Sequence, residues 1–153
     1  MKYLTHRKSD FYGKSEQGQS LLEMAFALVI LLLLVAGIVD LGRLFFTWVA
    51  IRDAAQEGAA YASVCPPNGP GNAQQIRDHI KGSSHFPVDL SQPNVLVASG
   101  FTDQPTPGSQ VFVIVTYTNF EFVMPILPLF IPGGSLDIPA RADDVSLQFE
   151  CPK

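Results

Sequence analysis

The sequence has little charge, and its first 64 residues contain no proline. Charged residues make up 16% of the 153 residues, against about 25% in average proteins, whereas apolar residues make up 47%. Ten Lys and Arg against fourteen Asp and Glu leave a net charge of −4. The shortage of basic residues argues against nucleic-acid binding, which needs a positive surface for phosphate. The apolar content argues against a disordered chain.

Patterns of catalytic and metal-binding residues are also missing. The three histidines and two cysteines do not have the spacing of a metal site. The chain contains no phosphate-binding glycine loop and no G-x-S-x-G motif. Asp143 and Asp144 are adjacent in a predicted strand, so their side chains point to opposite faces. We therefore predict that the chain is not an enzyme and needs no cofactor or metal.

Charge and proline divide the sequence into three regions. Residues 1–18 hold four basic and two acidic residues, a net charge of +2, whereas residues 19–153 hold six basic and twelve acidic residues, a net charge of −6. All twelve prolines follow Val64. The sequence therefore predicts a basic leader (1–18), a long helix (19–64) and a folded head (65–153).

The first half of the long helix is apolar enough to cross a membrane. Residues 24–39 are uninterrupted by charge, and Glu23 is the one charged residue between Leu21 and Val39. Because about 20 apolar residues span a bilayer core of about 30 Å, we predict a transmembrane segment over about 21–41. The positive-inside rule then places the leader in the cytoplasm and the head outside the inner membrane. A cleaved signal peptide fits less well, because its apolar region is about 7–15 residues long.

The second half of the helix carries small residues at a spacing of four: Ala50, Ala54, Gly58 and Ala62. Such a stripe allows another backbone to approach closely, which predicts packing against neighbouring copies or a sheet. An alanine-rich sequence that merely favours helix is an equally good explanation. Arg52, Asp53 and Glu57 are expected on the solvent side.

The head is predicted to combine a short helix with a small sheet. Prolines and glycines between Cys65 and Gly71 end the long helix. A second helix follows, with Asn72 as its N-cap, residues 73–81 as its body and Gly82 at its end. Strands are predicted at 94–99, 110–118 and 136–150, the second of them central. We therefore expect an α+β fold, with a long N-terminal helix and an antiparallel sheet packed on one helix face.

Residues 120–132 are apolar but irregular. They contain one charge, and Pro125, Pro128 and Pro132 exclude a regular helix or a central strand. One interpretation is a loop folded over the core of the head. The other is an exposed apolar patch that contacts a partner subunit or the membrane surface.

The two cysteines, Cys65 and Cys151, are predicted to form a disulfide if the head is exported to an oxidising compartment. The bridge would close a loop of about 85 residues, for which the chain-entropy model gives roughly 4–5 kcal/mol. Two unrelated reduced thiols are the alternative.

The junction between the basic leader and the apolar helix resembles the cleavage site of type IV prepilins. Gly18 precedes Gln19, and Glu23 is the fifth residue after Gly18. The resemblance implies that a prepilin peptidase cuts between Gly18 and Gln19. It also implies that Glu23 pairs with the new α-amino group of Gln19, in the same subunit or a neighbour, which would offset the cost of a carboxylate in lipid. A Glu23 side chain that only reaches back to the interface is the alternative.

The longer segment resembles the TadE-like family of tight-adherence (Flp) pilus systems. The residues that match its pattern, in order, are Gly18, Gln19, Glu23, Asp40, Gly42, Arg43, Phe45, Ala54, Ala55, Glu57, Gly58, Ala59, Tyr61 and Ala62. The resemblance implies a minor pilin or pseudopilin that takes part in assembling an adhesive type IV pilus. Its implied partners are a prepilin peptidase, major and minor pilins, the inner-membrane assembly platform and membrane lipid.

Two other functions are compatible with these residues. One is a single-pass, membrane-anchored extracellular binding domain that is never processed, and the other is a pseudopilin of a related secretion machine. The leader separates the first from a pilin, because a permanent anchor has no use for Gly18 followed by Glu23.

Overall fold

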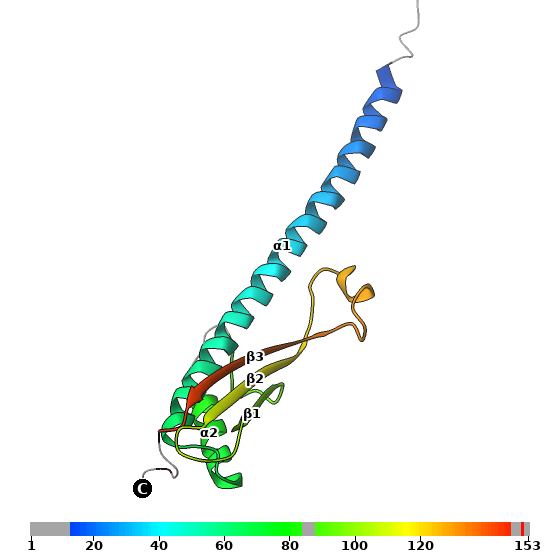
Figure 1. The fold of residues 1–153 in the computed structure, drawn as a ribbon. Coiled ribbons are helices and arrows are strands. Elements are labelled where there is room, and N and C mark those ends of the chain that lie inside the picture. Colours follow the sequence, from blue (N-terminus) through cyan, green and yellow to red (C-terminus); the bar gives the residue numbers. More distant parts are fainter. Residues whose placement is uncertain (1–12, 84–87, 148–150, 152–153) are drawn as a thin grey trace, which may run out of the picture.

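The structure, a computed structural model, describes residues 13–83, 88–147 and 151. It consists of one long helix with a small head at its C-terminal end (Figure 1). Helix α1 (Gly13–Val64) has 52 residues, which corresponds to about 80 Å at 1.5 Å per residue. It begins six residues before the predicted start and ends where the prolines begin. The predicted leader therefore lies partly in α1 and, for residues 1–12, outside the described residues.

The head contains one further α-helix and one sheet, which confirms the α+β fold. Its elements are α2 (Pro70–Gly82), β1 (Val95–Phe101), β2 (Gln110–Phe120), the 3₁₀ turn η1 (Leu127–Leu129) and β3 (Leu136–Val145). The three strands are antiparallel in the order β1-β2-β3, so β2 is central as predicted.

The core lies between the sheet and the C-terminal half of α1. Alternate residues of β2 face the helix and are fully buried, as expected for a strand with one covered face. α2 closes one side of this core with two buried isoleucines. The buried set includes Ile51, Ala54, Ala55 and Ala62 of α1, Ile76 and Ile80 of α2, Val111, Val113 and Val115 of β2, and Ile138 and Ala140 of β3.

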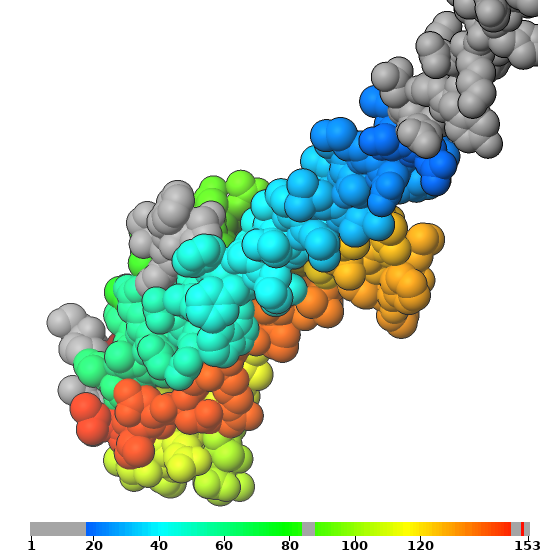
Figure 2. Space-filling model, turned by 90° about the horizontal axis from the view of Figure 1, so that it is seen from above, coloured from blue at the N-terminus to red at the C-terminus, as the bar shows by residue number. Residues whose placement is uncertain are grey.

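The N-terminal half of α1 extends away from the head. From residue 18 to residue 39 every side chain is exposed or half-buried, and the space-filling view shows this part of the helix as a rod that leaves the head (Figure 2). It contains the one helix segment, among the described residues, that is long and apolar enough to cross a membrane.

Two predictions for the head were wrong in detail. The N-cap of α2 is Gly69, not Asn72, because Gly69 adopts a φ of 97° and Pro70 then starts the helix, a position that suits proline. The Asn72 side chain instead donates a hydrogen bond to the Pro66 carbonyl at 2.9 Å. The last strand was predicted to run to residue 150 but ends at Val145, and residues 148–150 of that prediction lie outside the described residues. It ends early because the Leu147 N–H donates to the Ser63 carbonyl of α1 at 2.8 Å, which takes the chain off the sheet.

Candidate functional site

The predicted cleavage site lies near the start of α1. Gly18 and Gln19 are exposed and helical, so the bond between them is part of the continuous helix. A Cβ at Gly18 would meet no atom within 4 Å. This peptide bond is therefore open to an approaching enzyme, but the helix must unwind locally before an active site can hold it extended.

Glu23 is exposed one helical turn after Gln19. Residues four apart share a helix face, so a free α-amino group on Gln19 would lie on the same face as the Glu23 carboxylate. In the part of the chain that the structure describes, no hydrogen bond or ion pair joins Glu23 to another residue. The carboxylate thus stands alone on an apolar surface, available to a group outside this chain or to a new N-terminus.

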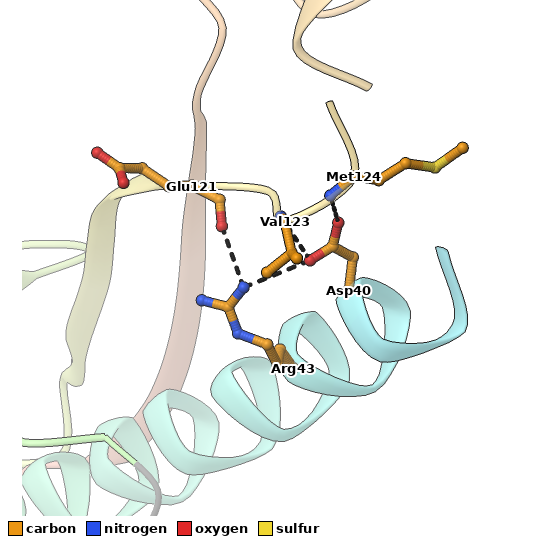
Figure 3. A network of polar contacts seen from close by, with 5 residues as sticks. All are labelled: Asp40, Arg43, Glu121, Val123 and Met124. Carbon is orange, nitrogen blue, oxygen red and sulfur yellow. Dashed lines mark hydrogen bonds and ion pairs between the residues drawn. The ribbon is translucent and has the colours of Figure 1, made fainter. Parts of the chain in front are cut away.

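Asp40 marks the point at which the apolar helix meets the head. Its carboxylate accepts hydrogen bonds from the backbone N–H groups of Val123 at 2.9 Å and Met124 at 2.7 Å. Arg43 donates to the same carboxylate at 3.3 Å and to the Glu121 carbonyl at 3.4 Å, as Figure 3 shows. Only 1% of Asp40 is exposed, so α1 and the segment after β2 are joined here by a buried carboxylate with several partners.

The i, i+3 spacing of Asp40 and Arg43 on one helix allows them to pair, but it does not indicate the partners after β2. A spacing of three on a helix is a local signal, whereas Val123 and Met124 are 83 and 84 residues away. The Arg43 guanidinium also lies over the Phe120 ring at 5.2 Å. The available signal was the family pattern itself, in which Asp40 and Arg43 both match.

The apolar segment 120–132 divides into a buried and an exposed part. Phe120 is 3% exposed and belongs to the core, whereas Leu129 and Phe130 are 81% and 79% exposed. The exposed part does not fold over the core but lies beside α1 (Figures 1 and 2). Burial in the core therefore applies to Phe120, and exposure applies to the residues near η1, whose predicted contact with a partner subunit or the membrane surface stays a prediction.

The small-residue stripe of α1 is buried inside this chain. Ala50, Ala54, Gly58 and Ala62 all face the sheet and α2. A Cβ added at Gly58 would collide with the Cδ1 atom of Ile80 and lie 3.1 Å from Cγ1 of Val113. The stripe was predicted to pack against neighbouring copies or a sheet, and in the structure it packs against the sheet of its own chain.

Cys65 and Cys151 form a disulfide. The bridge joins the C-terminal end of α1 to the segment after β3, close to the hydrogen bond between Leu147 and Ser63. Two independent links thus hold the end of the chain against α1.

The face of α1 that was predicted to be exposed to solvent is only partly exposed. Arg52 and Asp53 are exposed, but Glu57 is half-buried and lies 3.2 Å from Nε2 of His79 on α2. The His79 ring stacks on Tyr61 with 4.3 Å between ring centres. Among the residues that the structure describes, no group of three His, Cys, Asp or Glu could hold a metal ion.

The outer face of the sheet carries one ion pair. Arg141 and Asp143 of β3 make a bidentate contact, with a shortest distance of 2.6 Å, and the guanidinium lies 4.8 Å from the centre of the Phe112 ring. The hydrogen bonds from Arg141 hold the pKa of Asp143 below its ordinary value of 3.8. Both side chains are well exposed, so this pair contributes little to stability.

These features define a pilin-like class of protein: one long N-terminal helix, apolar enough to cross a membrane, with a small α+β head at its end. Residues 18–60 match the family model described as TadE-like protein. Over these residues the match agrees with the resemblance to the TadE-like family that the sequence indicated, and at the level of the family it supports a minor pilin-like protein associated with tight-adherence pili. No curated protein and no solved structure matches the chain.

Proposed function

We propose that this chain is a TadE-like minor pilin or pseudopilin that takes part in assembling a tight-adherence type IV pilus. In this proposal α1 crosses the inner membrane with the leader in the cytoplasm and the head outside. A prepilin peptidase removes residues 1–18. The role is structural rather than enzymatic, and its partners are other pilins and the inner-membrane assembly platform.

The observation that carries the proposal is where the family match begins. It starts at Gly18, the residue after which the cut is expected, and it leaves out the basic residues before it. The match then covers the whole apolar run and ends inside the part of α1 that packs on the head. The matched range is therefore Gly18 followed by most of the helix that would remain after cleavage.

Cleavage gives Glu23 its role. Removal of the leader frees the α-amino group of Gln19, one turn from the Glu23 carboxylate. A carboxylate costs about 2–3 kcal/mol near the centre of a membrane helix and less near its end, and pairing with an ammonium group offsets that cost. The pair can form within one subunit or between neighbouring helices as they assemble.

The first test is the N-terminus of the protein purified from its native membranes. Intact-mass measurement is expected to show loss of residues 1–18, with Gln19 first. Gly18→Val should block this loss, whereas Gly42→Val should not. The two glycines are matched, because both lie in α1 and neither has an atom within 4 Å of an added Cβ. An unprocessed leader in cells with an active prepilin peptidase would favour the permanently anchored binding domain.

A further inference from the structure

The loop between β2 and β3 has the largest concentration of exposed apolar side chains in the head. Among the described residues outside α1, eight large apolar side chains are exposed, and four of them fall within residues 123–130. These four are Val123, Ile126, Leu129 and Phe130, and the last two are about four-fifths exposed. Residues 122–136 contain no charged side chain. We call residues 123–131 the apolar loop.

Most backbone N–H groups of the apolar loop donate hydrogen bonds within the chain. Two of the eight residues from 123 to 130 are prolines, which have no N–H. Of the six remaining N–H groups, those of Val123 and Met124 donate to Asp40. Those of Leu127, Leu129 and Phe130 donate to carbonyls within the loop. Most donors of this segment are therefore satisfied by the chain itself, which lowers the cost of placing the loop at a membrane interface.

The apolar loop lies beside the end of the membrane-length run. A Cβ at Gly37 would lie 3.6 Å from the Met124 sulfur, and Asp40 holds the two N–H groups at the start of the loop. Val39 is the last residue of the uninterrupted apolar run. The loop sits at the end of the head that faces the free half of α1, whereas α2 and the other end of the sheet lie further away (Figure 1).

We propose that the apolar loop is a second membrane attachment, which inserts Leu129 and Phe130 into the interfacial layer of the leaflet on the side of the head. The inference rests on one part of the proposed function, the crossing of the membrane by α1, and not on cleavage. Because irregular backbone exposed to lipid is not found in the hydrocarbon core, the insertion is shallow. Two attachments, α1 and the loop, limit the tilt of the head relative to the membrane plane.

The position of the apolar loop favours lipid, rather than another protein chain, as what covers its exposed side chains. Residues 21–39 are covered by acyl chains if α1 spans the membrane, and the apolar loop lies against the last turns of that segment. Its exposed side chains then continue a surface that is already in contact with lipid. The Asp40–Arg43 cluster lies at the boundary, where polar headgroups and water begin.

Tryptophan probes in the full-length chain test the inference. Trp48 is the sole tryptophan, so a Trp48→Phe background allows one probe at a time. The loop probe is Phe130→Trp. Ile30→Trp, at an exposed position on α1, reports whether the helix is in lipid. Leu96→Trp, at an exposed position on β1, is the matched control in the head. Each protein is reconstituted in phosphatidylcholine–phosphatidylglycerol vesicles with or without brominated acyl chains.

The expected result is that the Ile30→Trp and Phe130→Trp probes both lose emission in brominated vesicles, while the Leu96→Trp probe does not. The emission of the loop probe should also shift to shorter wavelength. If the loop probe behaves like the control while the α1 probe is quenched, the inference is wrong and the anchoring of α1 stands. If neither is quenched, the anchoring fails and the inference fails with it.

Contact between copies is the other result that would overturn the inference. In that case the loop probe would be shielded from aqueous acrylamide but not quenched by brominated lipid. The shielding would also increase with the protein-to-lipid ratio. Lipid insertion instead predicts quenching that is independent of that ratio.

Discussion

Asp40 on α1 accepts the backbone N–H of Met124, 84 residues later in the chain, at 2.7 Å. The same carboxylate accepts the N–H of Val123, so one buried side chain caps the start of the apolar loop. No residue from 18 to 39 is fully buried, so Asp40 is the first buried residue along this part of α1. The position of the apolar loop relative to α1 therefore depends on Asp40.

Replacing Asp40 should release the start of the apolar loop. Asp40→Ala removes both acceptors, and hydrogen bonds to a charged group are worth about 1.5–3 kcal/mol. We expect faster hydrogen exchange of the Val123 and Met124 amides in the full chain held in micelles. Asp137→Ala is the matched control, because Asp137 also caps one backbone N–H, that of Asn119 at 3.0 Å. Unchanged exchange in the Asp40 variant would show that the loop is held by other contacts.

A larger side chain at Gly58 should destabilise the head. The space beside Gly58 is filled by Ile80 and Val113, and overpacking a core costs typically about 1–3 kcal/mol. Thermal unfolding of Gly58→Val, followed by near-UV circular dichroism, should show a lower midpoint. Gly42→Ala should instead raise the midpoint slightly or leave it unchanged, because Gly42 has no neighbour within 4 Å and alanine favours helix. Equal midpoints for Gly58→Val and the parent chain would mean that α2 repacks freely.

Loss of the disulfide should lower the stability of the head without displacing the end of the chain. The chain-entropy model gives roughly 4–5 kcal/mol for a loop of this size. The hydrogen bond from Leu147 to Ser63 does not involve the bridge, so we expect it to persist when the bridge is absent. Urea unfolding of Cys65→Ser/Cys151→Ser should match that of the reduced parent protein, with both well below the oxidised parent. If reduction lowers stability but the double variant does not, the effect comes from the free thiols rather than from the bridge.

The sequence was sufficient for the parts of the fold that follow local patterns. A charge-free run of apolar residues gives a helix of membrane length, and β-branched residues at alternate positions give the central strand β2. Pro66 and Pro67 set the end of α1. The pairing of Cys65 with Cys151 followed because the described chain has two cysteines and one way to join them.

The sequence was not sufficient where a residue's partner is distant. No residue near Asp40 in the sequence indicates that its carboxylate accepts hydrogen bonds from Val123 and Met124. Those bonds form only after the sheet has packed on α1. The small-residue stripe was ambiguous for the same reason, since a neighbouring subunit and the chain's own sheet require the same spacing. The N-cap of α2 was misassigned because the backbone of Gly69 and the ring of Pro70 outweighed the capping preference of Asn72.

The turn after residue 88 should lower the pKa of the Asp89 carboxyl group measurably. The Ser91 hydroxyl, the Ser91 backbone N–H and the Gln92 amide all donate to this carboxylate, the first at 2.6 Å, and these bonds lower the pKa of Asp89 below 3.8. A lowered pKa means that the contribution to stability is present above the unfolded pKa and is lost as the pH falls through the folded pKa. In a carboxyl NMR titration, Ser91→Ala should raise the pKa of Asp89.

The same titration contains its own control at Asp143. The pKa of Asp143 is lowered mainly by hydrogen bonds from Arg141, which Ser91 does not contact, so it should not move in Ser91→Ala. An unchanged pKa at Asp89 would show that the backbone N–H and the Gln92 amide are sufficient. A shift at both carboxylates would indicate a general change in the head.

Replacing Glu23 should separate the cleavage of the leader from the assembly of the pilus. If the carboxylate pairs with a freed Gln19 terminus during assembly, Glu23→Ala should leave cleavage after Gly18 intact but reduce the number of surface pili. Met24→Ala is the matched control, because Met24 is the next residue on α1 and is also well exposed, at 69%. Electron microscopy of cells counts the pili, and intact mass reports cleavage. Normal piliation with Glu23→Ala would remove the assembly role while leaving processing untouched. Loss of cleavage in that variant would instead make Glu23 part of what the peptidase recognises.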